Sequence, residues 1–161
     1  MNNWDSYFLS ICKAVGSNSK CLSRKIGSIL VKDKVIICTG YNGPPRGVPH
    51  CDESKGDVRN LRTVGVCPRR LAGHNSGEGL HLCPAAHAER NTIDQAARLG
   101  ICTSGATLYL DTQVPCKECL ISIIQAGIVE VVCTELRHYD LKTGFILEHS
   151  DLRVRVFDLG G

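Results

Sequence analysis

The residues His87-Ala88-Glu89 and Pro115-Cys116-Lys117-Glu118-Cys119 decide how this chain is organised. Each group stands at the beginning of a run in which apolar residues recur at helical spacing, so each predicts the start of a helix. The first helix is expected over 86–99, with Gly100 as its C-cap, and the second over 115–125, opened by Pro115. Both motifs would therefore stand at helix N-termini, which carry a partial positive charge.

The side chains of these motifs are a typical set of zinc ligands. Cys116 and Cys119 are three residues apart, so on a helix they share one face and can bind the same ion. His87 adds a nitrogen ligand, and three protein ligands on tetrahedral Zn²⁺ leave one coordination position for water, as in catalytic sites. The ion lowers the pKa of that water toward neutrality, and Glu89 is placed to transfer its proton. The motifs thus predict a hydrolytic zinc site with Glu89 as acid and base.

The remaining pattern predicts an α/β fold with a mixed sheet covered by helices. Two apolar runs separated by a short turn indicate an antiparallel hairpin, and the nearly continuous apolar runs later in the chain indicate parallel pairing. The segment 40–84 lacks periodicity and is expected to be a long functional or metal-held loop. The expected strands are 27–31, 35–39, 107–110, 128–133 and 154–157, and further helices are expected over 4–16 and over 139–149, the latter interrupted at Gly144.

Composition excludes several other classes of protein. The chain has 161 residues, 43% apolar and 22% charged, which suits one globular domain. A formal net charge of +3 suits a small anionic substrate but is too low for a surface that coats nucleic acid. The first sixteen residues do not form a signal peptide and no apolar run could span a membrane, so a cytoplasmic location is expected. In that compartment the ten cysteines stay reduced, and those outside metal clusters are expected in the core, namely Cys12, Cys38, Cys102 and Cys133.

The motif pair H-x-E…P-C-x-x-C is the signature of zinc deaminases, and the chain matches it at every named position. Further likeness comes from Gly-Tyr-Asn-Gly-Pro-Pro-Arg-Gly at 40–47, Pro-His-Cys-Asp-Glu at 49–53 and the Cys-rich stretch 67–83. On these residues the chain resembles the deoxycytidylate deaminases of bacteria and phages, within the cytidine-deaminase-like superfamily. The resemblance implies a three-layer sandwich with a mixed five-stranded sheet and helices on both faces, and a homo-hexamer. It also implies a single domain over 1–161 with a Cys-rich, zinc-held insertion at about 44–85.

The same resemblance implies a reaction and its control. The reaction is hydrolysis of dCMP to dUMP and ammonia, in which water activated by zinc attacks C4 of cytosine. Glu89 would carry the water proton to N3 and then assist the departure of ammonia. Activation by dCTP and inhibition by dTTP, each with Mg²⁺, are implied at a second site near residues 41–47.

Four residues are candidates for contact with the substrate. The family likeness places Asn42 and Gly43 against the sugar or the base edge, although an Asn-Gly pair is also a common turn. Tyr139 corresponds to a tyrosine that lies beside the nucleotide in the family, although a tyrosine here could equally serve in the core or on the surface. Arg24 is a candidate partner for the phosphate, although lone arginines are often simply solvated.

A second zinc site is also predicted. Cys21 and Cys51 match the positions of structural-zinc cysteines in a phage relative, whose remaining ligands do not align with this chain. A segment as polar as 44–85 has no core of its own, and a metal can hold it together. The candidates for the other ligands are Cys67, His81 and Cys83, followed by His50 and His74.

Two alternative functions share part of this pattern. A deaminase that edits RNA or DNA, such as a tRNA adenosine deaminase, has the same zinc motifs, but no basic cluster with interleaved aromatics stands out here, and only 5% of residues are aromatic. A zinc-binding interaction module without enzymatic activity would have no use for Glu89 beside an open coordination position. Substitution of Glu89 therefore separates an enzyme from a binding module.

Overall fold

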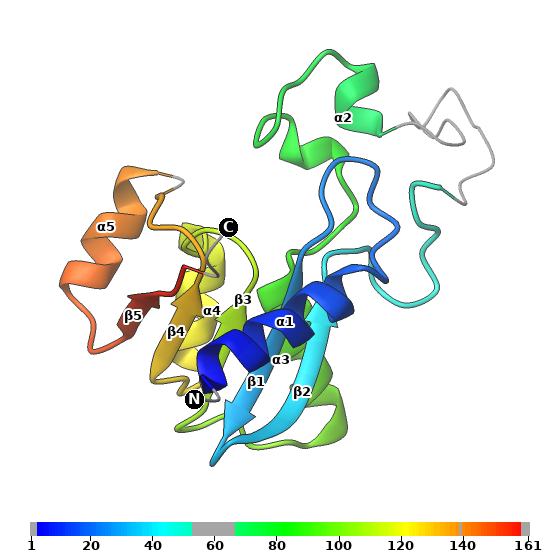
Figure 1. Ribbon diagram of the computed structural model, residues 1–161. Coiled ribbons are helices and arrows are strands. Elements are labelled where there is room, and N and C mark those ends of the chain that lie inside the picture. Colours follow the sequence, from blue (N-terminus) through cyan, green and yellow to red (C-terminus); the bar gives the residue numbers. More distant parts are fainter. Residues whose placement is uncertain (1–2, 53–66, 139, 159–161) are drawn as a thin grey trace.

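A computed structural model describes residues 3–52, 67–138 and 140–158 of the chain, so Tyr139 lies outside the described residues. Figure 1 shows one sheet with helices packed against it and a separate excursion that contains α2. The strands are β1 (Gly27–Lys32), β2 (Val35–Tyr41), β3 (Thr107–Leu110), β4 (Glu130–Cys133) and β5 (Arg153–Val156). The helices are α1 (Trp4–Gly16), α2 (Pro68–Leu71), the 3₁₀ helix η2 (Leu80–Leu82), α3 (Ala88–Leu99), α4 (Lys117–Gln125) and α5 (Leu141–Glu148).

The five strands form a mixed sheet in the order β2-β1-β3-β4-β5. Strands β1 and β2 pair antiparallel as the predicted hairpin, and β1 also pairs antiparallel with β3. Strands β3, β4 and β5 are parallel, as the apolar runs of β3 and β4 predicted; β5 itself alternates arginine and valine. The carboxyl ends of β3 and β4 and the start of β1 therefore meet at the same end of the sheet.

The two faces of the sheet bury two separate groups of side chains. On one face, Phe8 and Leu9 of α1 pack against Ile29 and Tyr109. On the other face, helices α3 and α4 cover a cluster that includes Leu30, Leu108 and Ile123. Adjacent residues such as Ile29 and Leu30 point to opposite faces, and both are buried, which explains why this strand is apolar without alternation. The predicted three-layer sandwich is confirmed.

Two glycines allow the layers to approach closely. A Cβ atom at Gly27 would lie 1.9 Å from the Cys12 carbonyl oxygen, so the last turns of α1 contact the first residue of β1. A Cβ atom at Gly40 would lie 2.4 Å from Thr92 Oγ1, so α3 lies directly on β2. The Thr92 hydroxyl also hydrogen-bonds with the Ser28 hydroxyl of the neighbouring strand β1, at 2.9 Å.

The structure corrects four details of the sequence prediction. The segment 40–84 contains the short helices α2 and η2. Helix α5 continues through Gly144, because Asp140 caps its N-terminus and a glycine in a helix costs only about 1 kcal/mol. Cys102 is exposed, since it lies in the loop after α3, whereas the other three predicted core cysteines are buried. Helices α3 and α4 begin at Ala88 and Lys117, so Pro115 precedes the cap and does not occupy the first turn.

None of the helices within the described residues is both long enough and apolar enough to cross a membrane.

Candidate active site

Three predicted metal ligands come together at two helix N-termini. His87 is the N-cap residue of α3 and Cys116 is the N-cap residue of α4, each with extended backbone, and Cys119 lies in the first turn of α4. The His87 Nδ1 atom lies 3.4 Å from the Cys116 sulfur and 3.4 Å from the Cys119 sulfur. The three ligand atoms all lie within 4.8 Å of one another. Both helices thus direct their positive ends toward this cluster.

The spacing of these atoms fits zinc. In a tetrahedral site with Zn–S bonds of about 2.3 Å and Zn–N bonds of about 2.0 Å, nitrogen and sulfur lie about 3.5 Å apart. The two observed nitrogen–sulfur distances of 3.4 Å agree with this value. Hydrogen bonds from Cys119 and His87 lower the pKa of the Cys116 thiol, which favours the thiolate, the form that binds metal.

Glu89 lies in the first turn of α3 and is only 5% exposed. It lines a cavity of about 420 Å³ together with His87 and Cys116. Burial raises the pKa of the Glu89 carboxyl above its ordinary value, while the nearby His87 opposes this effect. A carboxyl group that can exist in both protonation states at the wall of a cavity is suited to accept and return a proton. The cavity therefore contains the acid and base that hydrolysis requires.

Asn42 lines the same cavity, yet its amide is already engaged by the backbone. Its Oδ1 atom accepts a hydrogen bond from the Ile26 amide at 2.9 Å, and its Nδ2 atom donates to the Arg24 carbonyl at 2.8 Å. Gly43 forms a two-way backbone bridge with Ala86, with N–O distances of 3.1 and 2.9 Å. This bridge comes directly before His87, so the loop after β2 helps to position this predicted zinc ligand.

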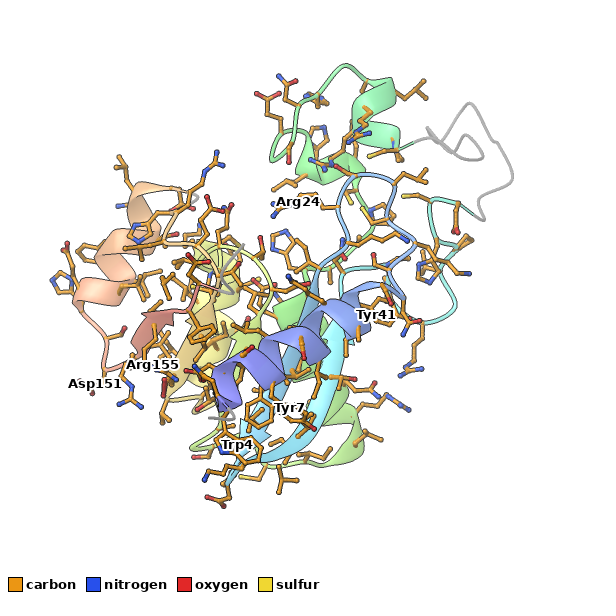
Figure 2. All side chains as sticks on the ribbon, viewed as in Figure 1. Trp4, Tyr7, Arg24, Tyr41, Asp151 and Arg155 are labelled. Atoms are coloured by element: carbon orange, nitrogen blue, oxygen red, sulfur yellow. The ribbon has the colours of Figure 1, made fainter. Side chains whose placement is uncertain are left out.

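Arg24 also lines the cavity, and its guanidinium donates to the Thr112 hydroxyl at 2.6 Å. The charge of Arg24 is among those that affect the pKa of His87 and of Glu89, so Arg24 lies close to the centre. Figure 2 shows Arg24 on the α2 side of the molecule, opposite the end that carries Trp4 and Tyr7.

The predicted second metal site is only partly assembled. Cys51 lies within electrostatic range of three of the other candidates, Cys21, Cys83 and Cys67. Burial, and then these neighbours, raise the pKa of the Cys51 thiol to about 11. In the described part of the chain, only the cluster around His87 brings three ligand atoms within 4.8 Å. The His81 ring packs edge-on against the His74 ring at 6.2 Å, and His50 lies beside Gly43.

Several residues around the cavity were not identified from the sequence. Asn91 donates to the carbonyls of Tyr41 and Gly43, at 2.8 and 3.1 Å, and so ties the loop after β2 to α3. Arg69 of α2 is buried at the cavity wall, although a pair of arginines in a polar segment gives no sign of burial. Asp140 also lines the cavity, and its position before a helix could have identified it as a cap.

Known proteins resemble this chain over most of its length. Residues 2–135 match the family described as the cytidine and deoxycytidylate deaminase zinc-binding region. The deoxycytidylate deaminase of Schizosaccharomyces pombe is 35% identical over 155 residues, which are 96% of this chain and 44% of the fungal protein. That of Saccharomyces cerevisiae is 36% identical over 96% of this chain and 45% of its own length. The chain thus spans less than half the length of these two relatives.

A phage relative matches nearly end to end. The deoxycytidylate deaminase of Mycobacterium phage D29 is 38% identical over 135 residues, which are 81% of this chain and 93% of the phage protein. A crystal structure of the dCMP deaminase from the cyanophage S-TIM5, in complex with dCMP and dUMP, superposes with a TM-score of 0.68 over 94% of both chains. At 23% identity, this second likeness shows the shared fold. The family match and the phage relative together show that the chain belongs to the cytidine and deoxycytidylate deaminases that carry this zinc-binding region.

Proposed function

We propose that the protein catalyses the hydrolysis of dCMP to dUMP and ammonia. The observation that carries this proposal is the convergence of His87, Cys116 and Cys119 beside the buried Glu89, in one cavity. The curated relatives named deoxycytidylate deaminases, and the complex of the cyanophage enzyme with dCMP and dUMP, support this choice of substrate.

The residues of the chain divide the work between metal binding and proton transfer. Zinc, when held by His87, Cys116 and Cys119, supplies a water molecule that ionises near neutral pH. Glu89 would accept one proton of that water and deliver it to N3 of the cytosine ring. After attack at C4, Glu89 would carry the second proton of the water from the attacking oxygen to the exocyclic amine, which leaves as ammonia. One water is consumed and one ammonia is released, with no change in oxidation state.

The test is an assay of the purified zinc-loaded protein with five substrates. These are dCMP, dCTP, CMP, cytidine and a deoxycytidine oligonucleotide, each followed by the loss of cytosine absorbance. We expect the highest kcat/KM with dCMP. Turnover of the oligonucleotide alone would replace the proposal with an editing activity, and no turnover of any of the five would contradict a cytosine deaminase.

Control by nucleoside triphosphates is a second part of the proposal. We propose that dCTP with Mg²⁺ activates the enzyme and that dTTP with Mg²⁺ inhibits it, through the loop 41–47. The support is mechanical, since this loop is bonded to Ala86 and Asn91, on either side of the ligand His87. A dCMP saturation curve that dTTP leaves unchanged in rate and in cooperativity, at saturating Mg²⁺, would contradict the idea.

A structural zinc is a third part. We propose that it is bound by Cys21 and Cys51, with its remaining ligands among Cys67, His81 and Cys83. The electrostatic proximity of Cys51 to Cys21, Cys67 and Cys83 supports the all-cysteine set. Metal analysis should find two zinc ions per chain, and a single ion would remove this site.

The proposed homo-hexamer is the last part. Several large apolar side chains are exposed on the α5 side of the sheet, and a monomer gains nothing by leaving them in water. The exposed apolar side chains are Leu136, Leu141 and Phe145, which are 69%, 95% and 55% exposed. Light scattering after gel filtration should give about six times the mass of one chain, and a monomeric mass would contradict the proposal.

A further inference from the structure

Arg69 is an unusual arginine, because it is buried and only partly satisfied. It belongs to α2, in the Cys-rich insertion, and is 8% exposed. One guanidinium nitrogen donates to the Glu78 carbonyl at 2.9 Å. The Nε atom is buried and has no hydrogen-bond partner within the described residues. Unpaired polar groups of this kind are rare in folded proteins and call for an explanation.

Among the described residues that lie near Arg69 in the chain or line its cavity, three carboxylates are engaged elsewhere, and the fourth is Glu89. Glu78 accepts a hydrogen bond from the Asn75 amide at 2.9 Å, and Glu118 forms an ion pair with Lys117 at 2.8 Å. Asp140 caps α5 by accepting from the Thr143 amide at 2.8 Å. No ion pair joins Arg69 to any carboxylate of the described ranges. A buried charge without a partner is costly, and no carboxylate among the described residues offsets it, which favours a bound anion at this position.

Arg69 lines the same cavity as Glu89 and Arg24. These residues come from three separate parts of the chain: α2, the first turn of α3 and the loop before β1. The cavity volume, about 420 Å³, is within the range of sites that enclose small molecules. An anion at Arg69 can therefore belong to a molecule whose other end reaches Glu89.

We propose that Arg69 is a specificity-determining residue that donates hydrogen bonds to the 5′-phosphate of the substrate nucleotide. This inference rests on the proposed function, because it takes a pyrimidine nucleotide as the occupant of the cavity. A guanidinium is the side chain best matched to phosphate, since its parallel N–H groups bind two oxygen atoms at once. The insertion thus has a role in recognition, because it brings to the cavity a charge that the sheet and its helices do not provide.

The test compares two pairs of ligands that differ only in the phosphate. Competitive inhibition constants are measured for dUMP and deoxyuridine, and kcat/KM is measured for dCMP and deoxycytidine. The variants are Arg69→Gln, Arg69→Lys and, as matched control, Arg70→Gln, which removes an exposed charge from the next position of the same helix. We expect Arg69→Gln to weaken dUMP binding about 10- to 100-fold, the usual range for lost hydrogen bonds between charged groups, and to leave deoxyuridine unchanged. Arg69→Lys should recover part of the loss, and Arg70→Gln should match the wild type.

A purely structural role for Arg69 gives a different result. If Arg69 only holds α2 to the Glu78 carbonyl, its loss would weaken dUMP and deoxyuridine by the same factor, and this outcome would overturn the inference. Zinc content and thermal unfolding of each variant show whether it is folded. If Arg69→Gln fails to fold, the decision rests on Arg69→Lys. Weaker binding of dUMP alone supports the inference, and equally weaker binding of dUMP and deoxyuridine contradicts it. Failure of the wild type to deaminate dCMP would instead contradict the proposed function, so the two failures are distinguishable.

Discussion

The catalytic centre and the Cys-rich insertion both depend on cysteine and histidine, but they are built in different ways. His87, Glu89, Cys116 and Cys119 lie on the first residues of two helices that are packed against a buried sheet. The described residues of the insertion form only the short helices α2 and η2, set apart from the sheet in Figure 1. The two helices bring the ligand atoms of His87, Cys116 and Cys119 within 4.8 Å of one another, close enough to bind one ion. The described candidate ligands of the second site lie near Cys51, but no three of them are as close as this. A metal would add much more order to the insertion than to the centre.

The largest effect should come from the centre, where Glu89→Gln removes the proposed proton-transfer group and keeps the size of the side chain. We expect kcat for dCMP to fall by ~10²-fold or more, the usual range for loss of general acid–base catalysis. Because Glu89 is not among the three metal ligands, metal analysis should find the zinc content unchanged. Zinc loss in this variant would show that Glu89 supports the metal site, and wild-type turnover would remove its catalytic role.

The next effect concerns the contact between α3 and β2 that holds the centre. Gly40→Ala places a methyl group about where Thr92 Oγ1 and the Thr92 amide lie, at 2.4 and 2.6 Å. We expect a loss of about 1–3 kcal/mol in the free energy of unfolding, measured in urea, because α3 must shift. The control is Gly144→Ala in α5, where the nearest atom is 3.7 Å away and a gain of about 0.5–1 kcal/mol is expected. If the two substitutions changed the free energy of unfolding by the same amount, the close approach of α3 at Gly40 would not matter for stability.

A smaller effect should follow when the insertion loses a candidate ligand. Cys67→Ser should lower the zinc content from two ions per chain to one and raise KM for dCMP about tenfold, equivalent to ~1.4 kcal/mol, because Arg69 is two residues away. Zinc at His87 should remain. Cys102→Ser, at an exposed cysteine, is the matched control and should change neither quantity. Unchanged zinc content in Cys67→Ser would exclude Cys67 as a ligand.

The smallest effect should occur outside the cavity, where Asp5 of α1 is bonded to Arg155 of β5, labelled in Figure 2, and to the Tyr109 hydroxyl. The hydrogen bond from Arg155 is the main reason that the pKa of Asp5 lies below its ordinary value of 3.8. A lowered pKa in the folded state means that Asp5 stabilises the fold above pH 3.8 and loses this contribution as the pH falls further. Asp5→Asn should therefore cost about 1 kcal/mol at pH 7.

The difference between Asp5→Asn and the wild type should shrink when unfolding is measured below pH 3.8. A difference that stays constant over this range would show that Asp5 acts through packing and not through its charge. Activity with dCMP at pH 7 should be the same in both proteins, since neither Asp5 nor Arg155 lines the cavity.

Much of the fold could be predicted because its signals are local. The apolar runs of β1, β3 and β4 and the spacing in α1 and α3 depend on residues close together in the chain, and each of these elements was found near its expected bounds. The short helices α2 and η2 could not be predicted, since four and three residues are too few to show a helical period. The exposure of Cys102 was missed because burial depends on what packs against a residue.

The sequence by itself determined the chemistry of the centre. A histidine, a glutamate two residues later and a P-C-x-x-C motif specify the ligand types and their order. Cys116 and Cys119 come together locally, as the N-cap and a first-turn residue of one helix. The tertiary structure alone decided that Arg69 lies in the wall of that cavity and that the Asn42 amide is bonded to the backbone of Ile26 and Arg24. The two hydrogen bonds of Asn42 join residues 16 and 18 positions apart, and such pairs form only when packing of the sheet and helices repays the entropy of closing the chain between them.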